Sequence, residues 1–99
     1  MAIREVAFTS HAVRQFKKLP KASRPLIKDA IRKHLIDSDP GEMTRNRFRL
    51  RRASIHADCE LRTGDYRIFY RLMESGAIVT LIGEKRGSSL FVEGEELKL

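Results

Sequence analysis

The stretch ELRTGDYRIFYRL, residues 60–72, decides the fold, because charged and apolar residues alternate in it on both sides of one turn. Gly64 and Asp65 favour a tight turn, since glycine tolerates the positive backbone angles that such turns need. A period of two residues is typical of a β-strand with one buried face. Residues 59–62 and 66–73 are therefore expected to form an antiparallel hairpin.

The second strand of this hairpin has two chemically different sides. One side is apolar and suits a core: Tyr66, Ile68, Tyr70 and Leu72. The other side mixes cationic and apolar groups: Arg67, Phe69, Arg71 and Met73. This strand is therefore expected to bury its first side and to show guanidinium groups together with an aromatic ring on its second.

Similar alternation marks further strands on either side of the hairpin. Residues 47–51 place arginine at every second position, with Phe48 and Leu50 between them: Arg47, Arg49 and Arg51. Residues 77–82, after a turn at residues 74–76, are expected to form another strand, and residues 3–8 are expected to form the first strand. Successive strands joined by tight turns predict an antiparallel meander.

The segment between the first strand and residue 40 has helical periodicity instead. Thr9 or Ser10 is a candidate N-cap, and apolar residues then recur at spacings of three and four until Pro20. Ser23 and Pro25 mark a second start, from which the pattern runs to about Ile36. The expected fold class is α+β, with two N-terminal helices packed on one face of a small antiparallel sheet. Residues 1–99 are expected to form a single domain.

Charge and cysteine content narrow the possible surroundings. The chain has 99 residues, a formal charge of +7 and a pI near 10.1, which favours an anionic partner. Cys59 is the only cysteine, so no disulfide can form within the chain. No apolar run is long enough for a membrane span, and the first residues lack the apolar core of a signal peptide. A cytoplasmic location without membrane contact is expected.

The arginine-bearing sides of the strands suggest a surface for nucleic acid. If these strands are adjacent, the surface would contain these residues: Arg47, Arg49, Arg51, Phe69 and Arg71. Guanidinium groups bind phosphates, and an aromatic ring stacks on an unpaired base of single-stranded RNA. The alternative is a solvated face whose arginines pair with nearby carboxylates and contribute little. Five arginines within residues 45–52 exceed what the nearby carboxylates neutralise, which favours the nucleic-acid surface.

Three features together resemble the RelE/ParE toxins of bacterial toxin–antitoxin pairs. They are the helical hairpin with Leu19 and Pro20, the segment LRTGDYRIFYRL (61–72), and the segment IVTLIGEKRGSSLFVEGEE (78–96). The resemblance covers about residues 8–96. It implies a small α+β domain that a cognate antitoxin neutralises. It also implies one of two activities: RelE-type toxins cleave messenger RNA in the ribosomal A site without a metal, and ParE-type toxins poison DNA gyrase.

For RelE-type chemistry the resemblance implies that Arg67 matches the arginine beside the scissile phosphate. Lys85 or Arg86 lies about where the family carries a second cationic residue near the leaving group. Metal-free cleavage must deprotonate a 2′-hydroxyl, stabilise charge on phosphorus and protonate the leaving oxygen. Arg67 suits the second task as a fixed cation with paired donors. His56 is a candidate general base or acid, and an ordinary loop histidine is the alternative.

The sequence departs from RelE-type nucleases at Phe91. These nucleases usually place tyrosine or histidine in this region, and phenylalanine can stack on a base but cannot transfer a proton. Two alternatives to a nuclease therefore stay open: a ParE-like gyrase inhibitor, and a non-catalytic module that binds nucleic acid or an antitoxin.

Other catalytic and cofactor motifs are missing from the sequence. It has no glycine-rich phosphate loop and no Cys/His cluster at metal-ligand spacing, so we expect neither a metal nor a small-molecule cofactor. The expected partners are a cognate antitoxin protein and the ribosome with its messenger RNA.

Overall fold

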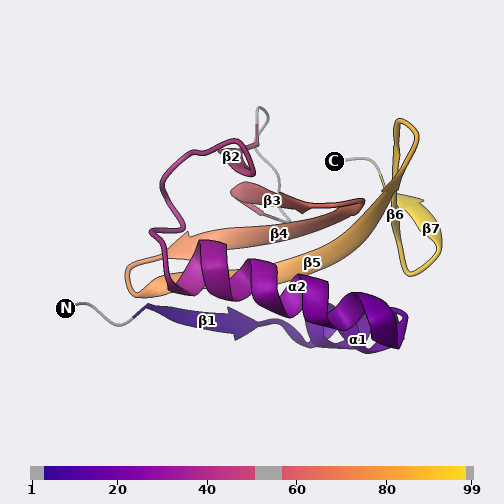
Figure 1. Ribbon diagram of the computed structural model, residues 1–99, viewed down its shortest axis with the longest axis horizontal. Coiled ribbons are helices and arrows are strands. Elements are labelled where there is room, and N and C mark those ends of the chain that lie inside the picture. The colour runs from indigo at the N-terminus through magenta and orange to yellow at the C-terminus, as the bar shows by residue number, and fades with distance from the viewer. Residues whose placement is uncertain (1–3, 51–56, 98–99) are drawn as a thin grey trace.

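The structure is a computed structural model that describes residues 4–50 and 57–97. Within these residues, two helices cover one face of a seven-stranded sheet (Figure 1). In chain order the elements are β1 (Glu5–Phe8), α1 (Ser10–Lys18), a 3₁₀ turn (Lys21–Ser23), α2 (Arg24–Ile31), a π-helical turn (Arg32–Ile36), β2 (Arg47–Arg49), β3 (Cys59–Thr63), β4 (Tyr66–Met73), β5 (Gly76–Arg86), β6 (Ser89–Val92) and β7 (Glu95–Leu97). The expected α+β class is confirmed.

The order of strands differs from a simple meander at β1. Strands β2 to β7 are each antiparallel to the next, but β1 runs parallel to the first half of β5. The prediction of a wholly antiparallel sheet is wrong for β1, because α1 and α2 carry the chain across the sheet before β2 begins. At residue 76 a Cβ atom would lie 1.9 Å from the Glu5 carbonyl oxygen, so this pairing requires glycine.

The helices are attached to the sheet at their N-terminal ends. The Thr9 hydroxyl accepts a hydrogen bond from the Ala12 amide at 3.1 Å, which confirms the first predicted cap. The second predicted cap is wrong, because Ser23 makes no side-chain capping bond. Its hydroxyl instead accepts a hydrogen bond from Tyr66 Oη at 2.8 Å, and this bond joins the start of α2 to β4.

The main core lies between the helices and the sheet. Its buried members come from both layers: Ala12, Ile27, Ala30, Ile31, Leu35, Cys59, Leu61, Ile68, Tyr70, Ala77, Val79 and Ile82. Tyr66 and Leu72 pack at its border, which confirms the predicted apolar side of β4. The buried Tyr70 hydroxyl donates to the Pro40 carbonyl at 2.7 Å and so anchors the loop after the helices.

A second apolar cluster covers part of the opposite face and corrects the prediction for Phe69. This ring is 1% exposed and packs with Ala57, Leu81 and partly buried residues of the C-terminal hairpin: Leu90, Val92 and Leu97. Strands β6 and β7, which were not expected from the sequence, pair as a hairpin whose apolar side chains cover the ring. Phe69 is therefore not available to stack on a base.

Arg47 is also buried, with 3% exposure, which contradicts its predicted place on a cationic surface. The register explains this: Arg47 pairs with Leu61, and Arg49 with Cys59, so both arginines lie on the helix side of the sheet. Arg47 Nη1 donates to the carbonyls of His34 at 2.7 Å and Asp39 at 2.5 Å. Its guanidinium therefore joins β2 to the end of the helical segment.

Candidate nucleic-acid interface

The sheet face that the helices leave uncovered carries a hollow of about 400 Å³. We call it the open-face hollow, and these residues line it: Leu50, Glu60, Arg67, Phe69, Lys85, Ser88, Ser89, Leu90, Glu96 and Leu97. Strands β3, β4 and β5 supply its floor, and the β6–β7 hairpin supplies a wall. Two predicted site residues, Arg67 and Lys85, are thus brought to one place.

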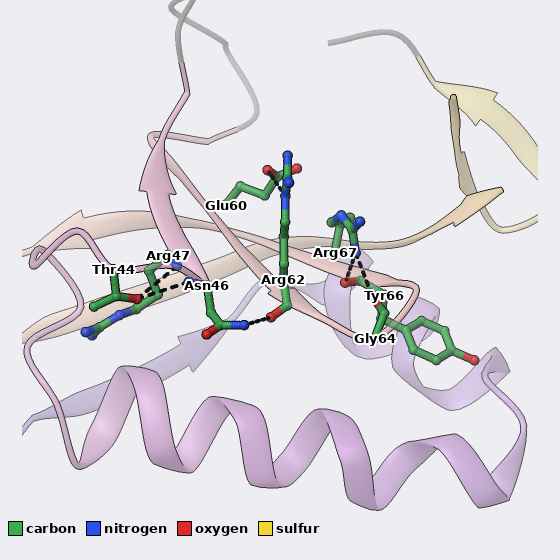
Figure 2. Close-up of polar contacts among 8 residues, drawn as sticks. All are labelled: Thr44, Asn46, Arg47, Glu60, Arg62, Gly64, Tyr66 and Arg67. Atoms are coloured by element: carbon green, nitrogen blue, oxygen red, sulfur yellow. Dashed lines mark hydrogen bonds and ion pairs between the residues drawn. The ribbon is translucent and has the colours of Figure 1, made fainter. Parts of the chain in front are cut away.

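Arg67 occupies the end of β4 next to the turn and is half-buried. Its Nη1 donates to the carbonyl oxygens of Gly64 at 2.8 Å and of Tyr66 at 2.9 Å, so the turn holds the guanidinium in position (Figure 2). Its Nε is buried and has no hydrogen-bond partner among the described residues. The turn therefore fixes the position of the Arg67 cation, while its Nε shares its unpartnered, buried state with the Nε atoms of Arg24 and Arg47.

Lys85 adds a second cation from the neighbouring strand. Its amide donates to the Asp65 carbonyl at 2.7 Å, which ties β5 to the turn that holds Arg67. Gly83 faces Arg67 across the β4–β5 pair, and Lys85 lies two residues further along the same face. The two cations therefore lie on either side of Gly83, and β6 packs closely over that glycine.

The hollow also contains two carboxylates that the sequence analysis missed, Glu60 and Glu96. Glu60 pairs with Phe69 across β3 and β4, and Ser89 Oγ donates to Glu96 at 3.3 Å. The sequence could have placed Glu60 on the same side of the sheet as Arg67. The two-residue turn at residues 64 and 65 sets the register of this hairpin and so puts Glu60 opposite Phe69. Glu96 could not be placed in this way, since it depends on a hairpin that the sequence did not suggest.

Arg86 and Phe91, two other predicted site residues, lie on the opposite side of the sheet. Alternation along β5 turns Arg86 away from Lys85, and Phe91 pairs with Glu84 on that side. The Arg86 guanidinium carbon lies 5.1 Å from the centre of the Phe91 ring, and Arg86 forms an ion pair with Glu84 at 3.0 Å. Both line a larger hollow of about 530 Å³ between α1 and the sheet. They are thus separated from Arg67 by the sheet itself.

The remaining predicted residues are dispersed. Arg49 is exposed on the helix side at the edge of the sheet, and Arg71 is half-buried beside Ile78, near the far end of β4. Arg51 and His56 lie outside the described residues. The two described members of the predicted row, Arg47 and Arg49, therefore do not form one surface with Arg67.

The wall of the open-face hollow is joined to α1 through Glu93 in the β6–β7 turn. Arg14 Nε and Lys18 Nζ lie 3.0 Å and 3.1 Å from Glu93 Oε1, and Arg14 Nη2 donates to Oε2 at 3.2 Å. Hydrogen bonds from Arg14 and then Lys18 lower the pKa of Glu93 from its ordinary 4.5 to about 2. The Glu93 carboxylate therefore joins the β6–β7 turn to helix α1.

Within residues 4–50 and 57–97, no three His, Cys, Asp or Glu side chains are grouped as metal ligands. In the same parts of the chain, no helix has the length and apolar character needed to cross a bilayer. No protein-family model and no curated protein matches the chain.

Proposed function

We propose that this chain is a RelE-type toxin that cleaves messenger RNA on the ribosome without a metal, and that the open-face hollow is its active site. The observation that carries the proposal is the joint presence of Arg67, Lys85 and two carboxylates in that hollow. It adds to the resemblance of residues 61–72 and 78–96 to this family. These groups are of the chemical kinds that metal-free RNA cleavage uses for charge stabilisation and proton transfer, which supports the proposal.

The proposed reaction is an internal phosphoryl transfer. The 2′-oxygen bonds to the adjacent phosphorus as the bond from phosphorus to the 5′-oxygen breaks, which leaves a 2′,3′-cyclic phosphate and a 5′-hydroxyl. Arg67 neutralises the charge that gathers on the non-bridging oxygens. A carboxylate, Glu60 or Glu96, accepts the proton of the 2′-hydroxyl, and Lys85 protonates the leaving 5′-oxygen. Phe91 lies on the helix side of the sheet and takes no part in these steps.

Primer extension on messenger RNA in a translating cell-free extract tests this proposal. Wild-type protein should produce new 5′ ends at codon-spaced positions, only while translation proceeds. Arg67→Ala should lower the initial cleavage rate by about a hundredfold or more, because a positioned donor to the developing charge is lost. Circular dichroism and urea unfolding of the variant would show that its fold is retained.

Two outcomes would contradict the proposal. A folded Arg67→Ala protein that cleaves as fast as wild type would remove Arg67 from the chemistry. Intact message with wild-type protein would exclude the nuclease activity, and DNA damage with filamentation in cells that express the chain would then favour a gyrase inhibitor.

A further inference from the structure

Two arginine side chains of this sheet sit over phenylalanine rings in the same local arrangement. In each, an arginine pairs with the glutamate two residues before it, and a phenylalanine on the next strand faces that glutamate. On β3 and β2 the three residues are Arg62, Glu60 and Phe48; on β5 and β6 they are Arg86, Glu84 and Phe91. The Arg62 guanidinium carbon lies 4.4 Å from the centre of the Phe48 ring, and that of Arg86 lies 5.1 Å from the Phe91 ring.

The two arrangements differ in the face that they occupy. Arg62 is the direct cross-strand partner of Arg67, so both side chains leave the sheet on the side away from the helices (Figure 2). Directly paired residues on one face have Cβ atoms about 4.5–5.5 Å apart, and like charges there oppose folding. Arg86 lies on the helix side, as described above. Only the Arg62 arrangement is therefore next to the proposed scissile phosphate.

The backbone of Arg62 is held from the neighbouring segment. Its amide donates to the Asn46 carbonyl at 2.7 Å. Asn46 Nδ2 donates to the Arg62 carbonyl at 3.3 Å (Figure 2). Thr44 Oγ1 in turn accepts a hydrogen bond from the Asn46 amide at 3.2 Å. The Arg62 side chain is nevertheless 45% exposed, with Phe48 on one side and Glu60 at 3.2 Å. It is thus an exposed planar cation on a fixed support.

We propose that Arg62, supported by Phe48, is a stacking platform for a nucleobase of single-stranded RNA next to the phosphate bound by Arg67. Bases of single-stranded RNA stack on guanidinium planes as well as on aromatic rings. Arg62 and Phe48 thereby supply the base-stacking surface that the buried ring of Phe69 cannot supply. The platform rests on the proposed function, because it needs RNA in the open-face hollow. Arg62 is 45% exposed, so its ion pair with the largely buried Glu60 is screened by solvent on the arginine side and does little to offset the repulsion between Arg62 and Arg67.

The test is fluorescence anisotropy with a labelled single-stranded RNA of about eight nucleotides, a length within the usual range for such sites. A second probe has the same backbone without bases. Arg62→Lys keeps the charge but removes the plane, and Arg86→Lys makes the same change in the matching arrangement on the other face. Phe48→Leu removes the support under Arg62, and urea unfolding checks that every variant is folded.

Arg62→Lys should weaken binding of the RNA with bases about tenfold, and Arg86→Lys should stay within about twofold of wild type. Phe48→Leu should also weaken this binding. On the probe without bases, wild type and Arg62→Lys should bind equally. If Arg62→Lys binds the RNA as wild type does while Arg67→Ala weakens it, the platform is overturned and the proposed site stands. If wild type binds no RNA at all, the platform is overturned, and the proposed function is decided separately by primer extension in the translating extract.

Discussion

At the scale of single residues, the buried guanidinium of Arg47 is a structural group. It donates to the carbonyls of His34 and Asp39, which mark the end of the helical segment and the loop that follows. Replacing Arg47 with methionine keeps much of the apolar volume but removes both hydrogen bonds, and the Asp39 carbonyl keeps only the bond from the Glu42 amide at 3.1 Å. We expect this variant to lose about 2–4 kcal/mol of unfolding free energy, measured by urea denaturation.

Arg49 is the matched control, because it lies two residues further along the same strand and is exposed. Arg49→Met should change the unfolding free energy by no more than about 0.5 kcal/mol. Equal stability of the Arg47 and Arg49 variants would show that the buried hydrogen bonds of Arg47 contribute nothing.

Glu93 gives the molecule a pH-dependent contact between α1 and the β6–β7 turn. Its pKa is about 2 in the folded state and 4.5 ordinarily, so the folded state favours the ionised form. The stabilisation is therefore complete above about pH 4.5 and is lost as the pH falls toward 2. Glu93→Gln should lower the melting temperature at pH 7 and should match wild type near pH 2.

Glu42→Gln is the control, since this exposed carboxylate lies in the loop before β2. It should unfold at the wild-type temperature at pH 7. A Glu93→Gln protein with an unchanged melting temperature at pH 7 would show that the ion pairs with Arg14 and Lys18 do not stabilise the fold.

The limits of sequence reasoning at this scale are visible in β2. Alternation correctly separates Arg47 and Arg49 from Phe48, but it does not say which set faces the helices. The choice depends on the pairing of Arg47 with Leu61 and Arg49 with Cys59, two buried core positions. The open face was therefore assigned to the wrong residues of β2, whereas the side of β4 that bears Arg67 was assigned correctly because the other side is wholly apolar.

At the scale of elements, strands differ in how clearly the sequence marks them. The predicted bounds of β4 agree with the structure, because eight alternating residues lie between two glycine-containing turns. β7 was missed, since it has three residues and two are glutamates. Its turn is unusual as well: Glu93 has a φ of 53° and Gly94 a φ of 85°. Asn-Gly and Asp-Gly are the dipeptides that usually indicate such a turn, so Glu-Gly was a weak signal.

The packing of β6 on β5 depends on Gly83. A Cβ atom there would lie 3.0 Å from Leu90 Cδ1, 3.0 Å from the Phe91 carbonyl oxygen and 3.1 Å from Val92 Cγ2. Gly83→Ala should therefore displace β6 and lower the unfolding free energy by about 1–3 kcal/mol in urea titrations.

Gly41→Ala is the comparison for this change, because its nearest atom would be 3.4 Å away, an ordinary contact. Its unfolding free energy should stay within about 0.5 kcal/mol of wild type. If Gly83→Ala is as stable as Gly41→Ala, then β6 does not pack against Gly83 as closely as the structure shows.

At the scale of the whole molecule, the sheet separates two surfaces of different character. On one side the helices, the main core and the Glu93 contacts form a structural layer. On the other, the open-face hollow gathers cations and carboxylates beside the C-terminal hairpin. The long strand β5 takes part in both, so neighbouring residues of one strand belong to different surfaces. The central claim is that only the open face carries the chemistry.

Lys85 and Arg86 are the most direct test of this claim, because they are adjacent in sequence, both cationic, and on opposite sides of β5. The measurement is the initial rate of messenger RNA cleavage at one codon in a translating extract. Lys85→Ala should lower this rate about a hundredfold, as expected for loss of a proton donor, and Arg86→Ala should leave it within about twofold of wild type. An active Lys85→Ala protein together with an inactive, folded Arg86→Ala protein would place the chemistry on the helix side and contradict the claim.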